Sequence, residues 1–360
     1  MNFYVSCSPL WIEIMNYSDI SIQRLKNQQI VQSCFSSSKQ LVEWMGAIQA
    51  QDLPMALLAI ALRTKNSSVK SIEKTFNDGE IIRTHLMRPT WHIVSKDDIY
   101  WMLDLTAHSI KRMIGGRHNQ LELSKEILSK ANRLLEKNLQ GSELTREKIA
   151  KIFSENNIRT DENRLSHFLM NAELEQLICS NSLKGRWQTY ALLEEKVPDK
   201  KRLSREESIL KLTERFFFSH APATIADFAW WSFLPVKDIR WALEDLKSKF
   251  DSEKIEEETY YFPPETKENK TQKSSIHLLP AYDEFLISYK TKHISIANLH
   301  QRKAASVNGI FFPIIVENGQ IIGTWKKVTS KKNMEIETTF FNENEIDLNN
   351  ETQELLKLFI

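Results

Sequence analysis

One order of elements recurs three times in this sequence: a helix, a short turn, a second helix and a two-stranded hairpin. Helical patterns over 38–48 and 53–64 precede a β-rich stretch at 80–95. The same order runs through 144–194 and again through 223–264. A helix-turn-helix followed by a two-stranded wing is the winged form of that motif. The sequence therefore predicts a mainly α chain of the α+β class with three tandem winged-helix units.

Capping signals indicate where several of these helices begin. Ser37 followed by Gln40 has the pattern of a capping box, in which side chain and backbone bond reciprocally. Asp52 is a suitable N-cap for the helix after it, and Thr224 with Asp227 repeats the capping box in the third unit. We expect each helix to begin directly after its cap.

The last part of the chain changes from helical to strand periodicity. From residue 305, apolar runs are separated by Asn308-Gly309 and Asn318-Gly319, which are turn pairs typical of hairpins. We expect a small antiparallel β unit there and a short final helix, preceded by a polar loop at 265–275. The predicted divisions are an N-terminal extension at 1–17, winged-helix units at 18–120, 121–203 and 204–275, and a C-terminal segment with the β unit at 276–360.

Composition limits the possible classes of protein. Lys and Arg number 48 against 47 Asp and Glu, a net charge of +1, so nucleic-acid binding would need local clustering of basic residues. The cysteines at 7, 34 and 179 are isolated, which argues against a disulfide framework. No apolar run approaches about 18 residues and no signal-peptide pattern is present. We expect a cytoplasmic protein without membrane contact, whether the chain starts at Met1 or Met15.

Common catalytic motifs are missing from the sequence. It contains no HExxH, no phosphate-binding loop, no GxGxxG, no GxSxG and no Cys/His array at zinc spacing. We therefore expect no metal and no cofactor. If the chain is an enzyme, its chemistry comes from isolated residues in a cleft.

Gln49 and Gln51 form the most unusual candidate site. They stand directly before the predicted N-cap Asp52. In an extended segment, residues two apart point to the same side, whereas on a helix they would be about 200° apart. Two amides on one side can hold a water molecule and present dipoles to a developing positive charge. The alternative is a polar loop whose glutamines bond backbone groups.

Candidate DNA contacts fall into three other stretches. Each has a simpler structural interpretation as a core tryptophan with a surface histidine, a solvated hairpin tip or an amphipathic segment. Basic residues interleaved with aromatic ones suit phosphate contact and base stacking. Trp230 and Trp231, by contrast, are expected in the core of the third unit. The candidate contacts are Arg88, Trp91 and His92, then Lys184, Arg186 and Trp187, and then Tyr282, Asp283, Lys290 and Lys292.

Taken together, these stretches resemble the AlkZ-like DNA glycosylases. The resemblance rests on "LVEWMGAIQAQD", "RPTWHIVSKDD", "GRWQTYALLEE", "SHAPATIADFAWWS" and "LLPAYDEFLISYK", in this order from about residue 18 to about 328. It implies that three winged-helix units form a concave DNA channel closed by the β unit. It further implies that Gln49-Ala50-Gln51 is the Gln-x-Gln catalytic motif, which positions a water for hydrolysis without metal or cofactor.

The implied reaction removes bulky N7-alkylated purines from double-stranded DNA and unhooks interstrand crosslinks, in repair or self-resistance. Such a protein would act as a monomer in the cytoplasm, associated with the nucleoid. An N7-alkylated purine already carries a positive charge, so its departure needs no general acid. Because Gln51 contributes a dipole where relatives with Gln-x-Asp have a charge, we expect a slower or narrower enzyme.

Two other functions fit the same pattern. A winged-helix transcriptional regulator without catalysis would bind undamaged DNA and be indifferent to the glutamine pair. A protein-interaction module would show no salt-dependent DNA binding, whereas phosphate contacts impose a steep loss with salt. The acidic run at 251–258 makes the third hairpin a poor DNA contact.

Overall fold

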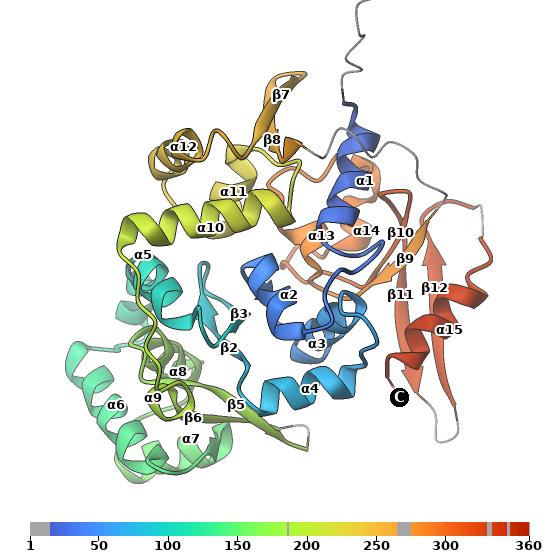
Figure 1. Ribbon diagram of the computed structural model, residues 1–360. Coiled ribbons are helices and arrows are strands. Elements are labelled where there is room, and N and C mark those ends of the chain that lie inside the picture. The colour runs from blue at the N-terminus through green and yellow to red at the C-terminus, as the bar shows by residue number, and fades with distance from the viewer. Residues whose placement is uncertain (1–14, 186, 265–274, 330–332, 344–345, 360) are drawn as a thin grey trace, which may run out of the picture.

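The computed structural model describes residues 15–185, 187–264, 275–329, 333–343 and 346–359. This part of the chain is a mixed α/β structure in which helices surround small antiparallel sheets (Figure 1). The loop expected at 265–275 lies outside the described residues except for Ser275, and so does most of the expected N-terminal extension.

The first region holds α1 and a three-helix group with its own sheet, followed by the long helix α5. Its elements are α1 (Tyr17–Asn27), α2 (Ser38–Met45), β1 (Ile48–Gln49), α3 (Leu53–Leu62), α4 (Val69–Asn77), β2 (Ile81–Leu86), β3 (Thr90–Ser95) and α5 (Ile99–Gln120).

The second and third regions repeat this arrangement. The second holds α6 (Lys125–Leu139), β4 (Leu144–Thr145), α7 (Arg146–Glu155), α8 (Arg164–Leu174), β5 (Ile178–Lys184), β6 (Trp187–Leu192) and α9 (Leu193–Lys196). The third holds α10 (Arg205–Ser219), α11 (Ile225–Ser232), α12 (Val236–Asp245), β7 (Asp251–Ile255) and β8 (Glu258–Phe262).

The three regions share one strand topology. In the first, β1 lies between α2 and α3 and pairs antiparallel with β3. In the second, β4 lies between α6 and α7 and pairs antiparallel with β6. In the third, Ala223 lies between α10 and α11 and forms an antiparallel bridge with Tyr261 of β8. Three helices precede each hairpin, not the two that the sequence pattern suggested.

Asp52 and Thr224 cap their helices as expected, whereas only the Ser37 half of the capping box expected at Ser37 and Gln40 forms. The side chain of Asp52 accepts a hydrogen bond from Met55 N–H at the start of α3. Thr224 and Asp227 form a complete capping box at the start of α11. Ser37 accepts from the N–H of Gln40 at the start of α2. The contact of Asp52 fixes the point at which β1 gives way to α3.

The C-terminal region contains a four-stranded antiparallel sheet in the order β12-β11-β10-β9. Asn318-Gly319 forms the predicted hairpin turn between β10 and β11. Asn308-Gly309 lies in a loop with a single bridge between Ala305 and Phe311, so the hairpin expected there is absent from the described residues. The elements are β9 (Ile276–Leu279), α13 (Glu284–Ile287), η2 (Asn298–His300), α14 (Gln301–Ala304), β10 (Ile314–Glu317), β11 (Gln320–Thr329), β12 (Met334–Phe340) and α15 (Asn349–Lys357).

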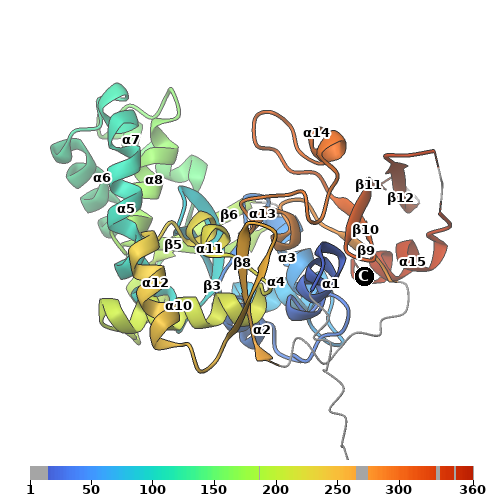
Figure 2. The same cartoon turned by 90° about the horizontal axis from the view of Figure 1, so that it is seen from above.

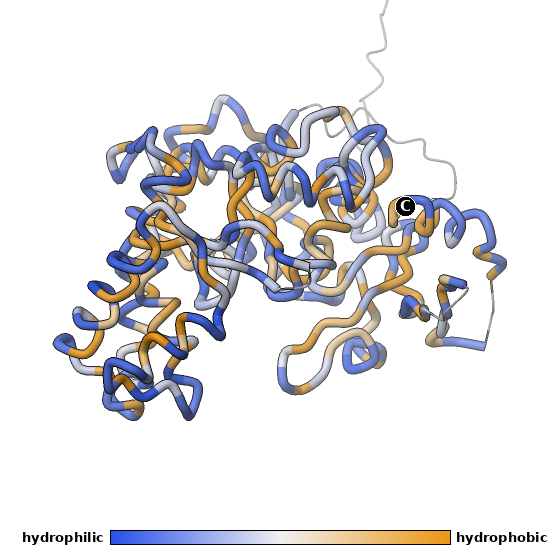
Figure 3. Tube along the Cα trace, turned by 90° about the horizontal axis from the view of Figure 1, so that it is seen from below, coloured by the Kyte–Doolittle hydropathy of each residue, from blue (hydrophilic) through white to orange (hydrophobic). Residues whose placement is uncertain are grey.

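The first three regions are not separate bodies, because one hydrophobic cluster runs through them. It includes side chains of α5, α10, α11 and α12 together with Ala47 and Met170. Helix α10 lies across α2 and α5 (Figure 1). In Figure 2, α6 and α7 project on one side of α13, and α14 projects on the other side. Figure 3 shows the same two projections from the opposite side, with apolar and polar residues alternating along the helices of the second region.

The segment around α13 joins the other regions. Asp283 is 2% exposed and accepts from both terminal nitrogens of Arg63, at 2.9 Å and 2.7 Å. Tyr289 accepts a hydrogen bond from the side chain of Gln28 in the N-terminal region. The backbone N–H of Lys290 donates to Asp227 of α11 at 2.8 Å. This segment therefore fixes the first and third regions relative to each other.

Candidate functional site

Gln49 lies at the end of β1, where two other elements hold it. Its backbone N–H donates to Oε1 of Glu284 at 2.6 Å. Its side-chain Oε1 accepts a hydrogen bond from Nη2 of Arg88 at 2.8 Å. The residue is 7% exposed. A charged donor thus fixes the orientation of the amide, and Oε1 keeps a second lone pair for another donor.

Gln51 stands in a different environment from Gln49. It lies in a bend beyond β1 and is exposed. The chain leading to it is held against β3, because Ala50 N–H donates to Trp91 O at 2.7 Å and Ala50 O accepts from Arg83 Nε at 2.9 Å. Alignment of the two glutamine side chains stays a prediction.

Glu284 is a buried carboxylate directly behind Gln49. It is 2% exposed and accepts from the indole N–H of Trp231 at 3.1 Å and from the hydroxyl of Ser288. Burial raises its pKa, but the neighbouring His220, the Ser288 hydroxyl and the Gln49 N–H together outweigh burial and hold the pKa at about 2. The site therefore contains a fixed negative charge at neutral pH.

Arg88 and His92 complete the polar surroundings of Gln49. Arg88 lies in the turn between β2 and β3, and burial lowers its pKa. His92 is the cross-strand partner of Gln49 and is fully buried. Burial, assisted by the charge of Arg88, lowers the pKa of His92 to about 3, so the ring is neutral at neutral pH. His92 is thus placed to shape the site and not to bind a phosphate.

Several polar atoms of the β2–β3 hairpin are buried and have no hydrogen-bond partner among the described residues. Buried groups of this kind are normally satisfied by protein or by ordered water. Part of this set lies in register with Gln49, because His92 pairs with Gln49 and Thr84 pairs with His92 across the sheet. The atoms are Thr84 Oγ1, Arg88 Nε, Thr90 Oγ1, Trp91 Nε1 and His92 Nε2.

Trp230 adjoins the same site, although the sequence placed it in the core. Trp231 is fully buried, but Trp230 is 43% exposed. The guanidinium carbon of Arg88 lies 5.9 Å from the centroid of the Trp230 ring. The indole N–H donates to the carbonyl of Ile287 at 3.1 Å. Helical periodicity could have separated these adjacent tryptophans, because Trp231 follows the buried Phe228 by three residues and shares its face, whereas Trp230 does not.

The four candidates at 282–292 divide between the interior and the surface. Asp283 is held by Arg63, and Nζ of Lys292 donates to the carbonyl of Leu286 at 2.6 Å. Burial lowers the pKa of Lys292 to about 7. Both charged ends are occupied within the protein, in contrast to the DNA contacts expected for them. Lys290 is exposed, and Tyr282 is partly exposed with its ring 5.8 Å from that of Phe311.

The remaining candidates lie on two hairpins. Trp91 packs on β2, with its ring centroid 4.3 Å from that of His85, which fits the structural interpretation of this residue. At the tip of the β5–β6 hairpin, Trp187 is 50% exposed and Lys184 pairs with Glu143 at 2.8 Å. Arg186 lies outside the described residues.

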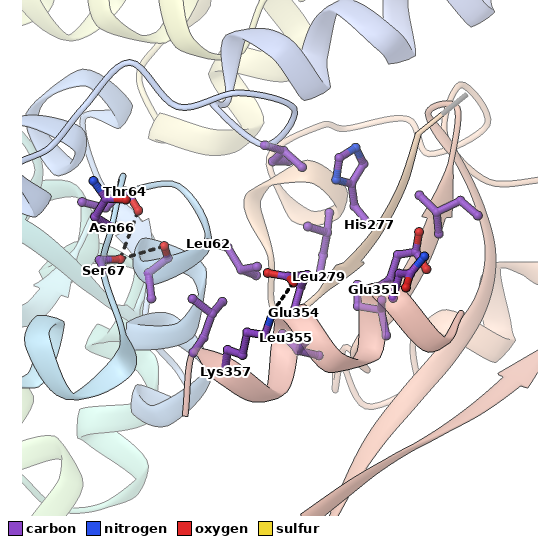
Figure 4. A pocket seen from close by; sticks show the side chains of 16 residues that line it. Leu62, Thr64, Asn66, Ser67, His277, Leu279, Glu351, Glu354, Leu355 and Lys357 are labelled. Atoms are coloured by element: carbon purple, nitrogen blue, oxygen red, sulfur yellow. Dashed lines mark hydrogen bonds and ion pairs between the residues drawn. The ribbon is translucent and has the colours of Figure 1, made fainter. Parts of the chain in front are cut away.

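A cavity of about 550 Å³ lies away from these residues, between the α3–α4 connection, β9 and α15. Figure 4 shows Glu354 and Lys357 of α15 on one side and Thr64, Asn66 and Ser67 on the other, with His277 above. None of the predicted site residues lines this cavity. Within the described ranges, no group of three metal-ligating side chains and no helix able to span a membrane occurs.

The buried site predicts a loss of stability in acid. The unfolded chain takes up a proton at His92 near pH 6.5, whereas the folded chain does so only near 3. Glu284 acts in the same direction between 4.5 and about 2. The unfolded state binds more protons, so the free energy of unfolding must fall as pH falls. Below pH 6.5, His92 should contribute about 1.4 kcal/mol per pH unit in denaturant titrations.

The matched variant for this prediction is His92→Gln, which cannot take up a proton. Its unfolding free energy should fall less steeply between about pH 6.5 and about pH 5, by the slope of one proton. Identical slopes for the two proteins would show that His92 is not a buried neutral group.

Comparison with known proteins gives consistent results. The model of the family described as DNA glycosylase AlkZ-like matches residues 42–358. An interstrand DNA cross-link repair glycosylase from Streptomyces sahachiroi is 22% identical over 332 residues, covering 85% of this chain and 86% of its own. The solved structure of the DNA glycosylase AlkZ from the same organism has a TM-score of 0.77 and 19% identity, covering 96% of this chain and 97% of its own. These descriptions name glycosylases and not transcriptional regulators.

Proposed function

The chain belongs to the AlkZ-like DNA glycosylase family, and from this premise we propose that it hydrolyses the N-glycosidic bond of bulky N7-alkylated purines in double-stranded DNA. The observation that carries the proposal for this site is the fixed amide of Gln49, bonded through its backbone to Glu284 and through its side chain to Arg88.

The three repeated regions are, in this proposal, three winged-helix units. Support comes from the strand topology, in which a short strand between the first two helices pairs with the second strand of the hairpin each time. The two projections on either side of α13 would then flank the DNA (Figure 2). Gln49 lies on the first unit, beside the segment that joins the first unit to the third.

The chemistry requires no general acid at the base. Water forms a bond to C1′ of the deoxyribose as the bond from C1′ to N9 breaks, and the purine leaves with that electron pair. The electron pair neutralises the charge that alkylation placed on the purine, and the water releases its proton to solvent. Gln49 and Gln51 would hold the attacking water, which keeps it close to C1′ before the bond breaks.

Glu284 supplies the electrostatic part of this mechanism. The sugar develops positive charge as the purine departs, and Arg88 alone would oppose that charge. The ionised carboxylate of Glu284, joined to the Gln49 backbone, offsets the guanidinium. A fixed charge in a buried site acts more strongly than in water and needs no reorganisation during reaction.

The substrate and setting follow from the same family. A relative is named as an interstrand DNA cross-link repair glycosylase, and we extend crosslink unhooking to this chain as part of the proposal. We further propose that the protein acts as a monomer in the cytoplasm, associated with the nucleoid. Gln51 carries no charge, so we retain the expectation of a slower or narrower enzyme than a Gln-x-Asp relative.

The direct test is abasic-site formation. A duplex with one N7-alkylguanine is incubated with the protein, and alkali-cleaved product is measured on a gel. Release above the spontaneous background, with no added metal or cofactor, is the expected result. A sequence-specific footprint on undamaged DNA without base release would favour the regulator instead.

DNA affinity should depend on Lys290. This residue is exposed next to α13 and is the best-placed candidate phosphate contact at 282–292. Lys290→Ala should weaken binding of damaged and undamaged duplexes alike and reduce the slope of log K against log salt by about 0.9. Fluorescence anisotropy at several salt concentrations measures both quantities.

The matched control for this measurement is Lys357→Ala. Lys357 is an exposed lysine on α15, paired with Glu354 at 2.5 Å and distant from the proposed DNA path. Its removal should leave the salt slope unchanged. Equal slopes for wild type and Lys290→Ala would exclude a phosphate contact at Lys290.

A further inference from the structure

Two sets of contacts connect Trp230 to Gln49, one through Arg88 and the other through α13. Arg88 donates to the Gln49 side chain at 2.8 Å and lies 5.9 Å from the centroid of the Trp230 ring. The indole N–H of Trp230 is bonded at 3.1 Å to the carbonyl of Ile287, at the end of the helix that begins with Glu284. Glu284 returns to the backbone of Gln49 at 2.6 Å. The Trp230 ring is therefore anchored in one place at the edge of the site.

These contacts hold the ring of Trp230 in place but leave it partly exposed to solvent. It is 43% exposed, whereas the neighbouring Trp231 is fully buried. Hydrophobic packing accounts for the buried position of the Trp231 ring. The ring of Trp230 is held in place but stays partly exposed, so its burial contributes less to the stability of the fold. Rigid, exposed aromatic rings next to a DNA-processing site are suited to stacking with planar groups.

Phe233, at the end of the same helix, gives a second observation. It is 41% exposed and its φ is +61°, in the left-handed region where glycine is favoured. A bulky residue in this backbone conformation costs conformational free energy. The partly exposed ring of Phe233 offsets only part of that cost through burial. Such positions point to a role other than folding.

We propose that Trp230, together with Phe233, stacks with a flat aromatic substituent carried on N7 of the alkylated purine, and so selects lesions of that class. This inference rests on the proposed glycosylase activity. Gln49 must act at C1′, whereas N7 lies on the major-groove edge of the base, so a bulky substituent on N7 extends into that groove and away from C1′. The Gln49 amide and the Trp230 ring both adjoin the guanidinium of Arg88, so the ring lies close enough to the site to meet such a substituent.

The test compares two lesions in the same duplex, N7-methylguanine and N7-(naphthylmethyl)guanine. The measured quantity is the ratio of their kcat/KM values for base release. Trp230→Ala should lower the ratio of naphthylmethyl to methyl release about tenfold, the loss expected for one stacking contact. Trp230→Phe, which keeps a flat ring, should restore most of it.

The control variant is Trp241→Ala. Trp241 is also 43% exposed, but it lies on α12 and has no described contact with Gln49, Arg88 or Glu284. Its removal should leave the ratio unchanged. An unchanged ratio in Trp230→Ala, or an equal fall in Trp241→Ala, would overturn the inference. Wild-type protein that releases neither base would instead refute the proposed glycosylase activity.

Discussion

Gln49→Ala is expected to lower the rate of base release by about 100- to 1000-fold. A loss of this size follows from removing one preorganised dipole at a position where charge develops. The amide of Gln49 is preorganised because Arg88 fixes its oxygen and Glu284 fixes its backbone. Single-turnover release of an N7-alkylguanine from duplex DNA measures the chemical step without product dissociation.

The design separates catalysis from folding and binding. Gln49 is bonded to Glu284 through its backbone, so the alanine variant keeps that contact and should fold, with a loss of about 1 to 3 kcal/mol because Arg88 loses its acceptor. Gln120→Ala removes an exposed glutamine at the end of α5 and should react at the wild-type rate. A Gln49→Ala protein as active as wild type would remove Gln49 from the mechanism.

Much of the fold could be predicted because its signals are local. The three hairpins and the capping residues Asp52 and Thr224 depend on side chains within a few positions of each other. The missed helix before the first hairpin, α4, also carries local signals, because Ser68 and Ser71 form a capping box and Ile72 and Phe76 lie on its buried face.

The site was only partly predictable because its contacts are long-range. Gln49 and Glu284 are 235 positions apart, and nothing in the local pattern says that they meet. The adjacent acidic residues Asp283 and Glu284 have different partners. Asp283 is bonded to Arg63, whereas Glu284 is bonded to Gln49. The sequence pattern alone could not assign a partner to either carboxylate.

Asp283→Ala is expected to lower the free energy of unfolding by about 3 to 5 kcal/mol. The carboxylate and Arg63 are almost fully buried and bonded twice. Removing one member leaves an uncompensated buried charge, which costs far more than the pair itself contributes. Chemical denaturation followed by tryptophan fluorescence measures the loss.

Two further variants test the reason for that loss. Arg63→Met/Asp283→Leu removes both charges and should be markedly more stable than Asp283→Ala, because no buried charge is left unpaired. Glu337→Ala breaks the exposed pair with Lys326 at 2.7 Å and should cost about 1 kcal/mol or less. If the double variant were as unstable as Asp283→Ala, the bridge would be needed for its shape and hydrogen bonds and not for compensation of charge.

Since this bridge joins α3 to the segment that carries Glu284, base release should decline together with stability in Asp283→Ala and recover in the double variant.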